Sequence, residues 1–206
     1  MNYLAHILLS GNNAQRQVGG FIADFVKGNR FEHFPEHIRQ GIVLHRRVDA
    51  FTDEHPLVRE ARALLRPYFG RYAGIFLDIF YDYFLAKNWH RFAPPSSGWR
   101  KFSNTSLKYF AYRFYANLVW SRRWLPISVK GFLWHFIGTN RLCKYAAKSG
   151  VQRALWIMGT YSSLPQMSEE AIQILQKHEV ELEKNFLIFF PILQEYARTL
   201  LVPRNV

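Results

Sequence analysis

The chain has 206 residues, of which 49% are hydrophobic, and this is enough for one domain with a sizeable buried core. Its single cysteine, Cys143, excludes a disulfide framework within the chain and fits a reducing cytoplasm, and no apolar run reaches the roughly 18 residues that a membrane-spanning helix needs. The formal net charge of +12 predicts an acidic partner, which nucleic acid, anionic lipid or an acidic protein would each satisfy.

The charge is distributed unevenly along the chain. Residues 83–168 contain 13 lysines and arginines and no aspartate or glutamate. All five aspartates and five of the eight histidines lie in residues 1–82. We therefore expect carboxylate and imidazole chemistry in the first part and a surface that attracts anions in the central part.

Helical periodicity runs through the first half of the chain. It predicts five helices, over residues 2–9, 14–26, 35–53, 56–65 and 71–90. Gly28 is a typical stop signal after the second helix, and Pro35 and Pro56 suit the first turns of the third and fourth. The segment "APPSSG" at 93–98 is predicted to be a loop.

The second half is also helical in pattern, with predicted helices near 104–120, 126–138 and 150–162. Ser168 is expected to cap a long last helix, which Pro191 should kink or break. Because no alternating strand pattern persists, the predicted fold class is all-α, a single globular helical bundle over residues 1–206. In this bundle, residues 1–90 hold the helices rich in aspartate and histidine, and 91–206 hold the basic, aromatic-rich and C-terminal helices.

Two pairs of polar residues interrupt otherwise apolar helix faces. His45 and Asp49 are four residues apart, as are Asp78 and Asp82, so the members of each pair project together. Carboxylate oxygens combined with imidazole favour one cation site built from both helices, for Mn²⁺, Mg²⁺ or Fe²⁺. The alternative is ion pairing with nearby arginines: Arg46, Arg47 or Arg71.

Four other residues allow a structural and a functional interpretation. Asp24 lies among apolar residues and is either a satisfied buried acid or part of a site. His6 is a lone histidine on an apolar helix, where a core role is common. Asp53 and His55 precede Pro56 and could end one helix and cap the next.

The basic segment also interleaves cations with aromatic residues, as in "KYFAYRFY" at 108–115. Such a pattern is found in proteins that bind single-stranded nucleic acid. More often, the aromatic residues belong to the core and the cations to a solvated face. The absence of any acid over 83–168 favours a functional positive surface.

Four motifs, in order and spacing, carry a resemblance to a known family: "MNYLAH", "ADFVKG", "GIVLHRRVDAFTDEHP" and "DIFYDYFLAKNW". Over residues 1–90 the chain resembles the acyl carrier protein phosphodiesterase family. The resemblance implies a divergent, all-helical version of the HD phosphohydrolases. It also implies use of a divalent metal, typically Mn²⁺, to remove 4′-phosphopantetheine from the serine of holo acyl carrier protein, an acidic partner.

The resemblance assigns candidate roles to particular residues. The implied metal-site residues are His6, Asp24, His45, Asp49, Asp78 and Asp82. Catalysis is assigned to Asp24, His45, Asp49 and Asp78, with His55 or His6 as the candidate proton donor. On the basis of positive charge, and not of the resemblance, the candidate substrate-binding residues are Arg46, Arg47, Arg122, Arg123 and Lys130.

Two positions depart from the family pattern: Tyr83 stands where histidine is usual, and Gly20 where asparagine is common. Adjacent helix residues point about 100° apart, so residue 83 cannot share the face of Asp82. Two other functions stay open: an HD-like phosphohydrolase acting on a nucleotide or small phosphoester, and a non-catalytic basic helical module. Nucleic acid is the less favoured partner.

Overall fold

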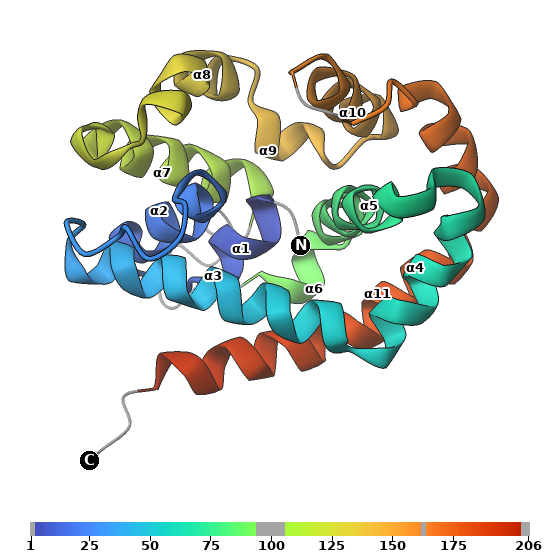
Figure 1. The fold of residues 1–206 in the computed structure, drawn as a ribbon, viewed down its shortest axis with the longest axis horizontal. Coiled ribbons are helices and arrows are strands. Elements are labelled where there is room, and N and C mark those ends of the chain that lie inside the picture. Colours follow the sequence, from blue (N-terminus) through green and yellow to red (C-terminus); the bar gives the residue numbers. More distant parts are fainter. Residues whose placement is uncertain (1–2, 94–105, 162–163, 203–206) are drawn as a thin grey trace.

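The computed structural model describes residues 3–93, 106–161 and 164–202, and the regular structure of these residues is entirely helical (Figure 1). The predicted all-α fold class is confirmed. Apart from Ala93, the loop predicted at 93–98 lies outside the described residues. Among the described residues, no helix is both long and apolar enough to cross a membrane.

The N-terminal helices are α1 (Tyr3–Leu9), α2 (Ala14–Ile22) and α3 (Glu36–Glu54). The second predicted helix ends earlier than expected, because a 3-10 turn, η1 (Ala23–Phe25), follows α2. The helices α2 and α3 cross closely: a Cβ atom on Gly19 would overlap the carbonyl oxygen of Ile38, and one on Gly41 that of Arg16. Glycine at this crossing therefore lets the two backbones approach.

The next helices are α4 (Pro56–Phe69), α5 (Ala73–Lys87) and the short α6 (Trp89–Phe92), with a 3-10 turn, η2 (Gly70–Tyr72), before α5. The predicted end of α4 at Leu65 is wrong, because the helix continues past Pro67. Because proline has no backbone N–H, the carbonyl group of Ala63, four residues earlier, loses its helical hydrogen bond. Ala63 and Pro67 are both exposed, so water can replace that bond. The predicted fifth helix is interrupted at Asn88, whose backbone N–H donates to the oxygen of Phe84 at 2.9 Å.

The basic part comprises α7 (Leu107–Trp120), η3 (Arg122–Trp124), α8 (Ile127–Gly138), α9 (Arg141–Lys144) and α10 (Lys148–Tyr161). The three helices predicted here are confirmed, and the short α9 is additional. The last helix, α11 (Ser168–Leu201), continues through exposed Pro191, so the helix does not break there, and the alternative of a kink stays a prediction. Ser168 is the first helical residue rather than the cap, and Met167 at the cap position makes no side-chain bond.

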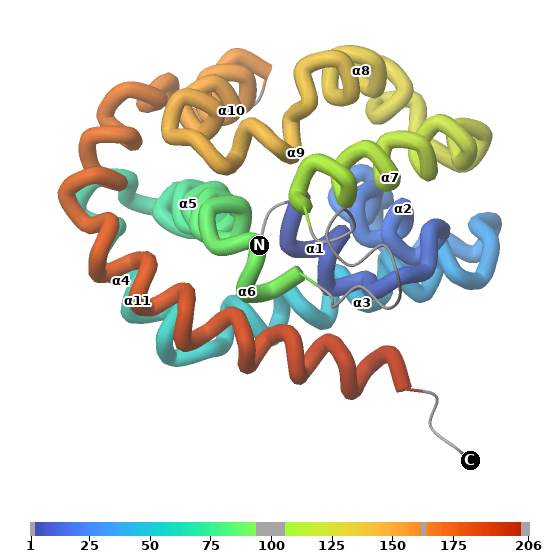
Figure 2. The backbone as a smooth tube through the Cα atoms, turned by 180° about the vertical axis from the view of Figure 1, so that it is seen from behind, coloured from blue at the N-terminus to red at the C-terminus, as the bar shows by residue number. Residues whose placement is uncertain are grey.

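The helices form layers around a buried apolar cluster that extends from α1 to α11. The helix α5 lies in the interior, with α11 running along α3 and α4 on one side and α7 to α10 on the other (Figures 1 and 2). Ten of the fifteen residues of α5 are buried apolar or aromatic residues, which accounts for its nearly uninterrupted hydrophobic sequence. The polar cluster described below lies where α1, α2 and α3 meet.

Candidate metal centre

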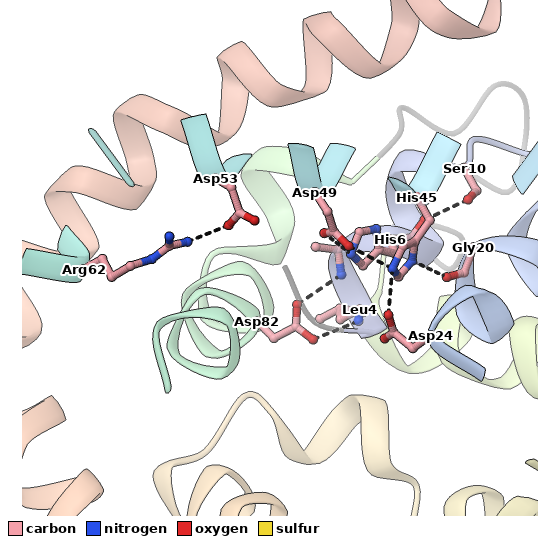
Figure 3. Close-up of polar contacts among 11 residues, drawn as sticks. Leu4, His6, Ser10, Gly20, Asp24, His45, Asp49, Asp53, Arg62 and Asp82 are labelled. Carbon is pink, nitrogen blue, oxygen red and sulfur yellow. Dashed lines mark hydrogen bonds and ion pairs between the residues drawn. The ribbon is translucent and has the colours of Figure 1, made fainter. Parts of the chain in front are cut away.

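Three elements bring four of the predicted site residues together: α1 supplies His6, η1 supplies Asp24, and α3 supplies His45 and Asp49 (Figure 3). The two oxygens of Asp49 face the two imidazoles, at 3.1 Å from His6 Nε2 and 3.0 Å from His45 Nε2. Asp24 Oδ1 lies 3.1 Å from the same nitrogen of His45. The two imidazole rings stack with their centroids 3.6 Å apart.

The orientation of His45 is set by the backbone of α2. Its Nδ1–H donates to the carbonyl oxygen of Gly20 at 2.8 Å, so Nε2 is the nitrogen that faces the carboxylates. When the ring is neutral, this bond places the free lone pair on Nε2, as is usual for histidines that bind metals. The glycine-lined crossing of α2 and α3 makes this contact possible, because it brings Gly20 close to α3.

Burial and close contact shift the protonation of all four groups. Burial alone would lower the pKa of His45, but hydrogen bonds to Asp24 and Asp49 outweigh it and raise the pKa to about 9. Burial and the nearby His45 lower the pKa of His6 to about 4. The pKa values of Asp24 and Asp49 are both lowered, since hydrogen bonds from the histidines outweigh the opposing effect of burial. Both carboxylates are therefore ionised at neutral pH.

The cluster has a buried side and an open side. The side chains of His6 and His45 are 2% and 4% exposed, whereas those of Asp49 and Asp24 are 37% and 60% exposed. The cluster is therefore open to solvent on the carboxylate side, while the imidazoles are held inside the protein.

The residues fit a divalent metal ion. Among the described residues, His6, His45 and Asp49 each offer a ligand atom, and these atoms all lie within 4.8 Å of one another. Two imidazole nitrogens and a carboxylate oxygen suit Mn²⁺ or Fe²⁺, and the nearby carboxylate of Asp24 adds a further oxygen donor. The geometry supports a metal site without identifying its ion.

With this geometry established, comparison with known proteins tests the predicted family. The family model described as acyl carrier protein phosphodiesterase matches residues 1–193. The chain belongs to the acyl carrier protein phosphodiesterase family. The match confirms the predicted family and the predicted class of enzyme, a phosphodiester hydrolase, and it extends well beyond the residues 1–90 on which the resemblance was recognised.

Several relatives with this name are similar along almost their whole length. The acyl carrier protein phosphodiesterases of Yersinia pestis and Enterobacter sp. (strain 638) are each 30% identical to this chain, over 96% of it and 98% of their own length. That of Photorhabdus laumondii subsp. laumondii is 31% identical, over 96% of this chain and 95% of its own. No solved structure matches, so the likeness to HD phosphohydrolases stays a prediction.

The structure places Asp82 outside the cluster, although the resemblance to the family implied that Asp82 is a metal-site residue. Its two oxygens accept hydrogen bonds from the backbone N–H groups of Leu4 and Ala5, at 2.9 and 3.1 Å (Figure 3). These amides belong to the first turn of α1, where no carbonyl of the same helix can accept them. Burial raises the pKa of Asp82 to about 7, against the opposing effect of these bonds. Asp82 thus anchors the helix that carries His6.

Asp78 also lies on α5, apart from the three residues whose ligand atoms converge. Burial raises the pKa of Asp78, and the negative charges of Asp49 and Asp53 contribute to the same shift. Asp78 is therefore within electrostatic reach of the cluster. Its role as a metal ligand stays a prediction.

His55 and Asp53 have the structural roles that the sequence left open. The Nδ1 atom of His55 accepts the backbone N–H of Leu57 at 3.3 Å, which caps α4, and its ring lies 4.8 Å from that of Phe189. Asp53 accepts a hydrogen bond from Arg62 at 2.6 Å. The capping interpretation of His55 is confirmed, and the structure gives its candidate role as proton donor no support.

The arginines next to His45 differ in environment. Arg46 donates to the carbonyl oxygens of Val26 and Gly28, at 2.9 and 2.6 Å, and so holds the segment that follows Asp24. Asp49 instead contacts the two histidines, so ion pairing between Asp49 and Arg46 is not what the structure shows. Among the other predicted substrate-binding residues, three are exposed and Lys130 is half-buried; the exposed ones are Arg47, Arg122 and Arg123.

The two departures from the family pattern have different settings. The hydroxyl of Tyr83 donates to Glu179 of α11 at 2.8 Å, so this side chain faces α11 and not the cluster. A Cβ atom on Gly20 would lie 2.6 Å from the hydroxyl oxygen of Ser10, which itself donates to the carbonyl oxygen of His6 at 2.8 Å. Sequence reasoning missed Ser10 and the carbonyl of Gly20 as supports of the histidines. The Gly19-Gly20 pair inside a helix was the available signal of close packing.

Proposed function

We propose that this protein removes 4′-phosphopantetheine from the serine of holo acyl carrier protein by metal-dependent phosphodiester hydrolysis. Family membership supports the reaction, because relatives at about 30% identity carry the name acyl carrier protein phosphodiesterase. The observation that carries the metal dependence is the convergence of His6, His45 and Asp49 within 4.8 Å on an apolar background.

In this proposal His6, His45 and Asp49 hold the metal ion, with Asp24 beside it and Asp78 as a further candidate. A bound divalent cation, Mn²⁺ by preference and Mg²⁺ or Fe²⁺ as alternatives, would supply charge to the phosphoryl oxygens and acidify a water molecule. The hydrogen bond from His45 to Gly20 keeps Nε2 aimed at the site. Asp49 keeps both imidazoles oriented by contacting each of them.

Asp24 is the group that we assign to the attacking water. It is ionised at neutral pH, because the partial desolvation that would raise its pKa is outweighed by the hydrogen bond with His45, which lowers it. Its side chain is 60% exposed. An exposed carboxylate at the open side of the cluster can orient the water and accept its proton. The phosphoryl group would enter from that side.

The basic central part is proposed to attract the acidic carrier protein. Residues 83–168 carry 13 positive charges and no negative ones, and Arg47, Arg122 and Arg123 are exposed. Charge of this kind accelerates encounter more than it tightens contact. The apparent KM for the carrier protein should therefore rise with salt, since exposed charges are screened beyond about 8 Å at physiological ionic strength. A KM independent of salt would contradict this part of the proposal.

The deciding experiment measures the mass of holo acyl carrier protein after incubation with the enzyme. Loss of the phosphopantetheine mass should stop on chelation and return with Mn²⁺. Asp49→Asn should abolish it, whereas Asp53→Asn, one turn away on the same helix and paired with Arg62, should not. Full activity in metal-free enzyme, confirmed by elemental analysis, would refute the metal site.

The alternative functions predict other results in the same experiment. A nucleotide-directed phosphohydrolase would leave holo carrier protein intact and hydrolyse free nucleotides or small phosphodiesters. A binding module would hydrolyse none of these substrates.

A further inference from the structure

The edge of the molecule formed by the end of α7 and by α8 exposes large apolar side chains. Trp120 and Ile127 are 91% and 87% exposed, and Trp134 is 59% exposed. Both views show α8 at the outer edge of the fold (Figures 1 and 2). Scattered exposed apolar residues are ordinary, but here two tryptophans and an isoleucine are exposed within residues 120–134, at the end of α7 and along α8.

The helix α8 is apolar on its outward face as well as on its inward face. Val129, Leu133 and Phe136 are buried against the rest of the protein. Residues 127, 131, 134 and 138 share the opposite face by helical spacing. Two of these are glycines, and no described atom lies within 4 Å of the position that a Cβ would occupy on Gly131 or Gly138. The middle of the outward face therefore consists of Ile127, Trp134 and bare backbone, and exposed Ser128 and His135 lie beside it.

Positive charge surrounds this face. Arg122 and Arg123 are exposed between α7 and α8, and half-buried Lys130 lies on α8 itself. The guanidinium of Arg123 lies 5.0 Å from the ring centroid of Trp124. Since no acidic residue occurs anywhere in 83–168, nothing within this segment offsets the charge. The complement to such a surface is anionic and, in part, apolar.

A phospholipid bilayer with anionic headgroups matches these properties best. Tryptophan favours the zone between headgroups and acyl chains, and arginine and lysine bind the phosphates above it. Single-stranded nucleic acid would stack on Trp120 and Trp134, but Ile127 and the glycine backbone offer it no stacking surface. We infer that Trp120, Arg122, Arg123, Ile127 and Trp134, here called the α7–α8 patch, bind reversibly to the surface of an anionic membrane.

The test is co-sedimentation of the full-length protein with vesicles of phosphatidylglycerol mixed with phosphatidylcholine, and with vesicles of phosphatidylcholine alone. The wild type should bind the anionic vesicles and not the neutral ones. The double variant Trp120→Ser/Trp134→Ser should bind the anionic vesicles about tenfold more weakly or worse, because it removes most of the apolar contact. Both side chains are exposed, so the variant should keep the helical circular dichroism of the wild type.

Matched controls separate the patch from net charge and from general hydrophobicity. Arg122→Glu/Arg123→Glu should lose binding, whereas Arg59→Glu/Arg66→Glu, with the same net charge on exposed positions of α4, should bind nearly as the wild type. Val180→Ser removes an apolar side chain that is 84% exposed on α11 and should have no effect.

Three outcomes would overturn the inference. The first is wild-type protein that stays in solution with anionic vesicles. The second is equal weakening by the two arginine pairs, which would mean that binding follows net charge alone. The third is a higher KM of the tryptophan variant for carrier protein in the absence of vesicles, or loss of single-stranded RNA binding in that variant, since the patch would then serve a protein or an RNA.

Discussion

Replacing Asp82 by alanine should destabilise the metal-free protein and weaken metal binding without removing a metal ligand. The carboxylate accepts the N–H groups of Leu4 and Ala5 at 2.9 and 3.1 Å, and alanine leaves both amides without this acceptor inside the protein. An unsatisfied buried donor costs about 1–3 kcal/mol, so the free energy of unfolding should fall by roughly 2–6 kcal/mol. At about 2–4 °C for each kcal/mol in a chain of this size, the Tm should fall by between about 4 and about 24 °C.

The assay is thermal unfolding of metal-free protein followed by circular dichroism, together with calorimetric titration of Mn²⁺. Because α1 carries His6 two residues after Leu4, a loosened α1 should lower the affinity for Mn²⁺ while one protein still binds the same number of ions at saturation. Asp53→Ala is the matched control: it breaks an exposed ion pair with Arg62 and should cost less than about 1 kcal/mol. An unchanged Tm in Asp82→Ala, combined with lost metal stoichiometry, would show that Asp82 is a ligand and that the capping argument is wrong.

Three further predictions concern Asp49, Tyr83 and Glu179. Asp49→Ala should abolish turnover, and Asp49→Ala/Asp78→Ala should be little worse, because ligand sets act as a unit; near-normal turnover in the single variant would contradict the site. Tyr83→His should change the rate about tenfold or less and leave metal stoichiometry unchanged, because the hydroxyl of Tyr83 donates to Glu179 of α11; a gain of metal in the variant would refute this. Burial alone would raise the pKa of Glu179, but hydrogen bonds, led by that from Lys148, lower it from 4.5 to about 2. This group therefore stabilises the fold fully above pH 4.5, and the stabilisation is lost as the pH falls towards 2. Glu179→Gln should lower the Tm at neutral pH, and between pH 4.5 and 2 its Tm should fall less steeply than that of the wild type. An equally steep fall in both proteins would exclude Glu179 as the source of this pH dependence.

Local spacing was enough to predict the helices and one part of the site. Apolar periodicity, together with Pro35 and Pro56, predicted where α3 and α4 begin. The spacing of His45 and Asp49 predicted that the two side chains project together. In the structure, His45 Nε2 lies 3.0 Å from Asp49 Oδ2. Both results depend on interactions within one helix, which sequence separation determines directly. The helix predicted to end at residue 65 continues past Pro67, and α11 continues past Pro191, because proline is tolerated where the helix face is exposed, and exposure depends on packing.

The same spacing could not distinguish a ligand from a structural carboxylate. Asp78 and Asp82 repeat the separation of His45 and Asp49, yet Asp82 binds the backbone of α1. Which element reaches a side chain depends on contacts between residues far apart in the chain, 77 and 78 positions in this case. His55, by contrast, caps α4 through a contact only two residues away, which the position of Pro56 had already suggested.

The sequence by itself therefore determined the helical class, the basic central part and the pair on α3, since each follows from composition or from residues within a few turns. Only the tertiary structure decided that His6 stacks on His45 at 3.6 Å and that Asp24 completes the group. The position of Asp24 beside His45 depends on the close crossing of α2 and α3, where Gly19 and Gly41 leave no room for a side chain. A crossing of this kind is a property of two packed surfaces, and no single helix contains the information that sets it.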